Sequence, residues 1–172
     1  MTIELTQPRL AANGTYESTM EPGTSGEESS LQGDFDPEKL SLCVRVTLAA
    51  NRASVDPVVA EVMQTIRRVK CVDGKEDAIE LALQEALANA VVHGAKEDPN
   101  KTVECIVACE EDRGLIIIVR DPGPGFDVGA IPNSTVGENV YSNHGRGIFL
   151  INQLMDKVEF RKNGAEIHMV KK

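Results

Sequence analysis

The sequence predicts an α/β two-layer sandwich, in which helices cover one face of a mostly antiparallel mixed sheet. Two periodicities carry this prediction. Apolar residues alternate with polar ones from Leu42 to Leu48, which is typical of a strand with one buried face. From Val58 to Val69 they recur every three or four residues, as on an amphipathic helix. Two further apolar segments, 103–109 and 115–120, have the length and composition of strands.

A capping sequence precedes each of two predicted helices. Asp56-Pro57 reads as an N-cap followed by a proline at the first helical position. Asp73, with Glu76 three residues later, has the form of a capping box. The helix that it begins is expected to run to about His93, where Gly94 can end it.

The C-terminal part predicts one more helix and a hairpin. Helical spacing resumes at Gly147 and continues to Leu154. Asn163-Gly164 is a pair preferred in two-residue hairpin turns, so we expect two closing strands around it. The polar segment 126–143 has no periodicity, and a stretch of that length inside a domain is expected to be a functional lid or disordered.

Composition divides the chain into an acidic tail and one domain. Residues 1–39 carry 8 acidic and 2 basic residues, and residues 13–36 have few large apolar groups. Such a segment buries too little surface to offset the loss of conformational entropy. We therefore expect residues 1–39 to be a disordered acidic tail and residues 40–172 to be the folded domain. The domain has 19 acidic and 16 basic residues, which argues against DNA or RNA as its main partner.

The cysteines and the N-terminus indicate a cytoplasmic protein. Cys43, Cys71, Cys105 and Cys109 form no C-x-x-C pair, and we expect buried thiols in a reducing compartment. The N-terminus lacks the basic stretch and apolar core of a signal peptide. The longest strongly apolar run, 115–119, is too short to span a bilayer.

A first group of polar residues lies on the second predicted helix. Glu85, Asn89 and His93 follow one another at four-residue steps, which places them on one face. A carboxylate and an amide on a mostly apolar helix can bind a ligand. On its own, this group also fits a solvated helix edge.

Two further groups are rich in glycine. Asp121-Pro122-Gly123-Pro124-Gly125 follows the most apolar predicted strand, and glycines there let a backbone approach a ligand closely. An ordinary turn at the end of a strand can have the same composition. His144-Gly145-Arg146-Gly147-Ile148 opens a helix, where free N–H groups and the helix dipole favour an anion. A single G-x-G is nevertheless common in loops.

The order of the three groups resembles the ATP-binding pattern of the GHKL superfamily, whose domain is the Bergerat fold. Within it, the segments EALANAVVHG, DPGPGF and HGRGIFLI are similar to those of the anti-sigma factor serine/threonine kinases. The resemblance covers residues 40–172, and it implies an ATP-binding kinase domain with Mg²⁺ as the accompanying ion.

The resemblance also implies a role for each residue. Glu85 matches the general base that would deprotonate the attacking hydroxyl, and Asn89 matches the Mg²⁺ ligand. Asp121 matches the residue that accepts a hydrogen bond from the adenine amino group. Gly123 and Gly125 would let the backbone lie against the base and the ribose.

The third group matches the part of the family site that holds phosphates. Gly145 and Gly147 match the lid glycines whose N–H groups bind them. Arg146 stands where many relatives have an apolar residue. The sequence leaves two alternatives for its side chain, contact with a phosphate or exposure to water. His93 matches a common family position, for which a structural role and a catalytic role both stay open.

The resemblance implies a kinase that phosphorylates a small STAS-type antagonist protein, binds a sigma factor and forms a homodimer. A nucleotide-switched binding module is the first alternative, although a pure binder has no need of a base at Glu85. The second alternative is the catalytic domain of a sensor histidine kinase. That protein needs a phosphoacceptor histidine ahead of the domain, whereas the three histidines here are His93, His144 and His168.

Overall fold

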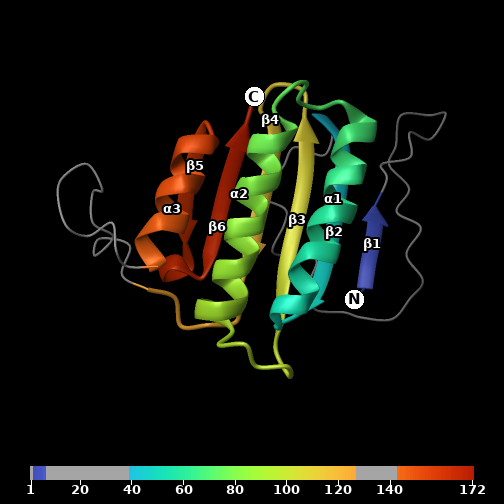
Figure 1. Ribbon diagram of the computed structural model, residues 1–172. Coiled ribbons are helices and arrows are strands. Elements are labelled where there is room, and N and C mark those ends of the chain that lie inside the picture. The colour runs from blue at the N-terminus through green and yellow to red at the C-terminus, as the bar shows by residue number, and fades with distance from the viewer. Residues whose placement is uncertain (1, 7–38, 127–142) are drawn as a thin grey trace.

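The computed structural model describes residues 2–6, 39–126 and 143–172, and within them it forms the predicted two-layer sandwich (Figure 1). The six-stranded sheet has the order β1-β2-β3-β4-β6-β5. Every described pairing is antiparallel, so the mixed character that we predicted is not found in these residues. The strands are β1 (Thr2–Thr6), β2 (Leu40–Ala49), β3 (Thr102–Glu110), β4 (Gly114–Arg120), β5 (Lys157–Arg161) and β6 (Glu166–Lys171).

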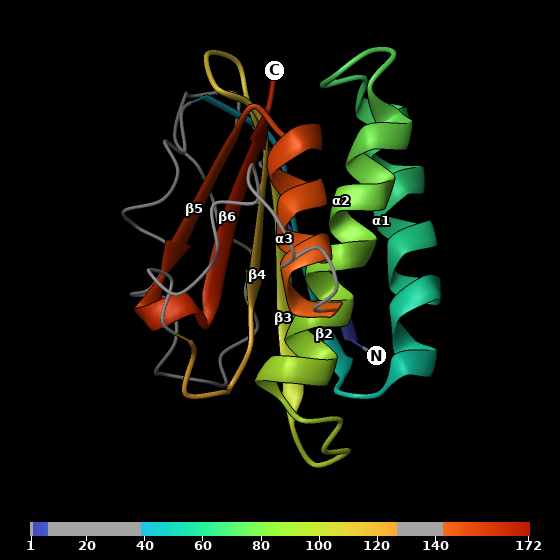
Figure 2. The same cartoon turned by 60° about the vertical axis from the view of Figure 1, so that its left-hand side comes forward.

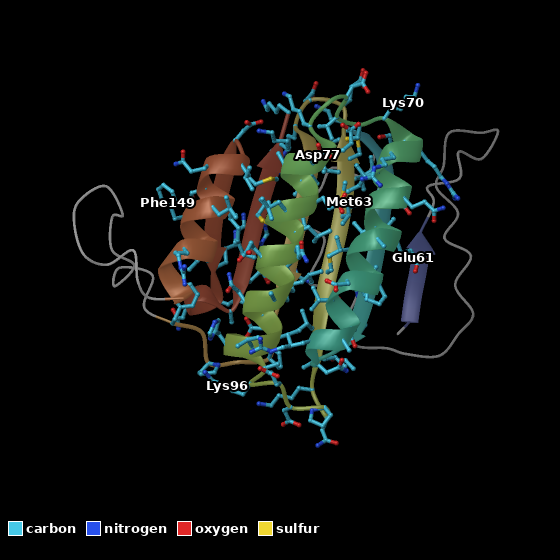
Figure 3. All side chains as sticks on the ribbon, viewed as in Figure 1. Glu61, Met63, Lys70, Asp77, Lys96 and Phe149 are labelled. Atoms are coloured by element: carbon cyan, nitrogen blue, oxygen red, sulfur yellow. A yellow bond between two sulfur atoms is a disulfide. The ribbon has the colours of Figure 1, made fainter. Side chains whose placement is uncertain are left out.

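The helices α1 (Val55–Val69), α2 (Glu76–Asn89) and α3 (Asn143–Leu154) all lie on one side of the sheet, as Figure 2 shows. The main core fills the space between the two layers. Alternate residues of β2 from Leu42 to Leu48 belong to it, and so does the fully buried Met63 of α1, which is labelled in Figure 3. On α3, by contrast, Phe149 is 44% exposed and points away from α2 (Figure 3).

The N-terminal strand corrects the predicted tail boundary. Thr2–Thr6 form β1, which pairs with β2 in a register that joins Thr2 to Thr47 and Thr6 to Cys43. The alternation of Ile3 and Leu5 is too short to predict a strand by itself, and the edge of β2 supplies the pairing partner that a local pattern cannot show. The rest of the predicted tail, residues 7–38, lies outside the described residues, as does the predicted lid from residue 127 to 142.

The predicted N-caps of α1 and α2 are wrong, although α2 does begin at Glu76, within the predicted capping segment. A 3₁₀ turn precedes α1, and its cap is Asn51, whose Oδ1 accepts a hydrogen bond from the Ser54 N–H at 3.0 Å. Helical backbone is therefore established before Asp56, which lies in the first turn of α1. At α2 the N-cap position is Lys75, with no side-chain cap, because Gly74 at φ 72° separates Asp73 from the helix.

Two further elements differ from prediction at their ends. α3 begins at Asn143 rather than Gly147, since its packing against α2 tolerates glycines that local propensity would exclude. The hairpin turn is also longer than two residues. The last β5–β6 pair is Arg161 with Glu166, and the residues between them include a turn at Lys162–Gly164.

A disulfide replaces two of the four predicted thiols. Cys71, in the turn after α1, is bonded to Cys109 on β3, with Cα atoms 6.1 Å apart. The two cysteines are 38 residues apart in sequence, so their proximity arises only from the packing of the helices on the sheet. The prediction of buried thiols holds for Cys105, while the free Cys43 is only partly buried.

Candidate functional site

The first and third sequence groups meet where α3 packs against α2. Gly147 is buried, and a Cβ atom placed on it would lie 2.7 Å from Glu85 Oε2 and 3.1 Å from Asn89 Nδ2. A side chain at position 147 would therefore displace the carboxylate or the amide. The fold brings together a carboxylate, an amide and the N-terminal turns of a helix, which is a suitable setting for an anionic ligand.

The first and second groups meet through Gly94. After Asn89 the helix continues into a π-helical turn (Ala90–Gly94), in which the Ala95 N–H donates to the Ala90 carbonyl at 2.8 Å. A Cβ atom on Gly94 would lie under 3.0 Å from the carboxylate carbon and both carboxylate oxygens of Asp121. Gly94 thus leaves the space that the Asp121 side chain occupies. The sequence predicts only a helix end at Gly94, and a π-turn has no sequence signal that indicates more.

The Asp121 carboxylate is held by its own loop. Its Oδ1 accepts a hydrogen bond from the Gly123 N–H at 2.7 Å, which fixes the orientation of the group. Burial raises the pKa of Asp121, while the Gly123 N–H and the positive charge of Lys96 oppose that rise. Lys96 lies in the loop after the π-turn and is labelled in Figure 3. A half-buried, oriented carboxylate is suited to accepting a hydrogen bond from a ligand.

The glycines of the second group lie against other protein segments. A Cβ atom on Gly123 would be 2.5 Å from the Gly94 carbonyl oxygen and 2.7 Å from Asp121 Oδ1. Gly125, at φ 77°, would place a Cβ atom under 3.0 Å from the backbone of Asn163 in the β5–β6 turn. These glycines therefore allow three backbone segments to approach closely around Asp121.

The remaining predicted site residues lie near this arrangement. His93 is partly buried in the π-turn, and Arg146 is exposed on α3. Gly145 belongs to the N-terminal part of α3. Among the residues that the structure describes, no group of three or more His, Cys, Asp or Glu side chains could hold a metal ion.

An ion-pair network fixes the end of β4 that leads to Asp121. Arg120 contacts Glu166 of β6 through Nε at 2.6 Å and Glu104 of β3 through Nη1 at 3.1 Å. His168 Nε2 lies 2.5 Å from Glu166 Oε1. Burial by itself would raise the pKa of Glu166, but hydrogen bonds from His168 and Lys162 and the charge of Arg120 outweigh it and lower the pKa to about 2. Three strands are thereby joined beside the site.

Comparison with known families defines the class of this protein. The model of the histidine kinase-like ATPase domain matches residues 48–171, which is most of the chain. The chain therefore belongs to the histidine kinase-like ATPase domain family, and the resemblance seen in the sequence is confirmed. Membership of an ATPase family implies ATP as the ligand.

Individual relatives are similar over a smaller part of the chain. The serine-protein kinase RsbW of Bacillus subtilis (strain 168) is 35% identical over 102 residues, which are 54% of this chain and 62% of the relative. That of Staphylococcus epidermidis is 34% identical over 108 residues, or 58% of this chain and 66% of the relative. The anti-sigma F factor of Bacillus cytotoxicus is 29% identical over 133 residues, or 74% and 80%. The chain thus spans just under two thirds of the two kinases.

None of the helices in the described residues has the length and apolar character needed to cross a membrane.

Proposed function

We propose that this protein is an ATP-dependent serine/threonine kinase that phosphorylates a small STAS-type antagonist of an anti-sigma factor and binds a sigma factor. The observation that carries the proposal is the arrangement around α2. Glu85 and Asn89 face Gly147 at one place, and Asp121 lies beside Gly94 at the end of the same helical segment. The names of the similar serine-protein kinases and anti-sigma F factor support the choice of substrate and partner.

In the proposed complex, adenine binds at Asp121 and the phosphates bind at the start of α3. The carboxylate accepts a hydrogen bond from the adenine amino group, which distinguishes adenine from guanine because guanine has a carbonyl at that position. The N–H of Gly145, in the first turn of α3, binds the phosphates where the helix dipole favours negative charge, whereas the N–H of Gly147 lies one turn further along the helix. Exposure of Arg146, which lies between these two glycines on α3, is compatible with the proposed contribution of its side chain to phosphate binding.

Glu85 acts as the general base in the proposed reaction. It accepts the proton of a serine or threonine hydroxyl as the hydroxyl oxygen attacks the γ-phosphorus of ATP. The new oxygen–phosphorus bond forms as the bond between the γ-phosphorus and the bridging oxygen breaks, and ADP leaves. In the structure Gly147 gives the Glu85 carboxylate room beside α3, where the phosphates are proposed to bind.

Mg²⁺ fits this set of donors as a companion of ATP. The ion usually keeps several waters and binds one or two protein oxygens together with substrate phosphates, so a complete protein cage is not required. Asn89 would supply its amide oxygen. When bound, the ion neutralises charge on the phosphates.

The decisive experiment is transfer of labelled γ-phosphate to STAS-domain proteins from the same genome. Wild-type protein should label serine or threonine on one of them, and Glu85→Gln should be slower by about 10²–10⁴-fold while still binding ATP. Glu80→Gln is the matched control on the same helix, because Glu80 is exposed and pairs with Arg67 at 2.7 Å. ATP binding without transfer to any of these proteins would favour the nucleotide-switched binding module instead.

A further inference from the structure

The β5–β6 turn holds both ends of the segment that contains Asp121. The Asp121 N–H donates to the carbonyl of Ala165 at 3.0 Å, and the Phe126 N–H donates to the carbonyl of Asn163 at 2.6 Å. The two acceptors flank Gly164, so residues 121–126 are fastened at each end to one short stretch of backbone. The segment therefore depends on the shape of this turn.

Side-chain packing reinforces these two hydrogen bonds. The rings of Phe126 and Phe160 meet edge to face, with centroids 5.4 Å apart and planes at 75°. A Cβ atom on Gly164 would lie 2.7 Å from two ring carbons of Phe126. The backbone of Asn163 in turn leaves no room for a side chain at position 125. Turn and segment are thus in close contact on both sides.

The backbone of the turn is unusual. Lys162, Asn163 and Gly164 have φ angles of 50°, 55° and 88°, so three consecutive residues are left-handed. Such a conformation is uncommon for residues other than glycine, and it persists where the surrounding structure holds it. Here the surrounding structure includes the segment 121–126 itself.

We propose that the β5–β6 turn is a positioning element for the adenine-binding carboxylate. Asn163 and Gly164 act through Gly125 and Phe126, and they set where Asp121 lies without touching the nucleotide. This role rests on the proposed function, because it assumes that Asp121 binds adenine. With this role, Asn163 and Gly164 join the residues that determine nucleotide binding. Both lie outside the three sequence groups.

Gly164→Ala is the test, and the chain contains a matched control for it. Gly74 also has a positive φ, 72°, but an added Cβ atom there would meet nothing within 4 Å. Both substitutions impose backbone strain, whereas only Gly164→Ala pushes against Phe126. The readouts are the Kd for ADP by titration calorimetry and the hydrogen-exchange rate of the Gly123 amide, which binds Asp121 Oδ1.

Gly164→Ala is expected to raise the Kd for ADP by at least about tenfold and to speed exchange of the Gly123 amide by a similar factor. Gly74→Ala should leave both within about twofold of wild type. Folded Gly164→Ala protein that matches Gly74→Ala in both measurements would overturn the positioning role. If wild-type protein binds no ADP, the proposed function fails, and the exchange rate of Gly123 still decides whether the turn positions the segment.

A second variant covers the case in which Gly164→Ala does not fold. Phe160→Leu removes the edge-to-face contact with Phe126 without changing the backbone. It should raise the Kd for ADP by about threefold or more, and Phe149→Leu, which alters an exposed ring on α3, should not. Equal affinities of the Phe160 and Phe149 variants would contradict the proposal.

Discussion

Replacement of Gly94 by alanine tests how α2 and the Asp121 loop cooperate. The backbone at Gly94 has no positive φ, so alanine fits its conformation, and helix propensity favours alanine over glycine by roughly 1 kcal/mol. The new methyl group would nevertheless lie under 3.0 Å from the Asp121 carboxylate. The carboxylate must move, and it loses the 2.7 Å hydrogen bond from the Gly123 N–H.

The expected loss of affinity follows from that displaced carboxylate. A hydrogen bond to a charged group contributes about 1.5–3 kcal/mol, and the one to adenine would be lost or weakened. Since about 1.4 kcal/mol corresponds to a factor of ten, Gly94→Ala should raise the Kd for ATP by about 10–150-fold. Titration calorimetry with ATP measures the affinity, and urea unfolding checks that the free energy of unfolding changes by less than about 2 kcal/mol.

A double-mutant cycle separates this mechanism from general damage. If Gly94→Ala acts through the carboxylate, the double variant with Asp121→Ala should bind ATP no more weakly than Asp121→Ala alone. Additive losses would mean that the two residues act independently. A folded Gly94→Ala protein with wild-type affinity would refute the role that we assign to this contact.

Three other substitutions or conditions give separate predictions. Gly147→Ala should shift the Glu85 carboxylate and lower kcat by about 10²–10⁴-fold, with little change in the Kd for ADP; unchanged transfer would place the base elsewhere. Reduction of the Cys71–Cys109 disulfide, which joins cysteines 38 residues apart, should lower the free energy of unfolding, measured in urea, by about 4 kcal/mol. The same reductant should leave the free energy of unfolding of Cys71→Ser unchanged, and a wild-type protein insensitive to reductant would contradict the presence of the disulfide. Although burial raises the pKa of Glu166, its hydrogen bonds and the charge of Arg120 lower it to about 2, so its ionised form should stabilise the protein above pH 4.5, and this stabilisation should be lost as the pH falls towards 2. Urea unfolding of Glu166→Gln should therefore show a flatter acid limb, and a wild-type slope would be evidence against the network.

Local periodicity was sufficient to predict most of the fold. The alternation along β2 and the three-to-four spacing on α1 specify which side chains are buried, and those residues form the core between sheet and helices. Element ends were harder, because they depend on particular hydrogen bonds. The side chain of Asn51 caps the 3₁₀ turn that precedes α1. Nothing in the neighbouring sequence favours Asn51 over Asp56 as the capping residue.

The site could be predicted as a set of residues but not as an arrangement. Spacing on α2 placed Glu85 and Asn89 on one face, yet their contact with Gly147 depends on helix packing. The π-turn that brings Gly94 to Asp121 has no pattern in the sequence. Contacts of this kind arise between segments distant along the chain, and one sequence alone does not reveal them.

In the proposed complex, one ATP molecule contacts all three groups of residues. A crystal structure of the protein with Mg²⁺ and a non-hydrolysable ATP analogue tests it most directly. We expect the adenine amino group to donate to Asp121, the phosphates to lie at the N-terminal end of α3, and the metal ion to lie within reach of Asn89 and close to Glu85. An analogue bound at another place, or bound with its adenine away from Asp121, would contradict the proposed ATP site.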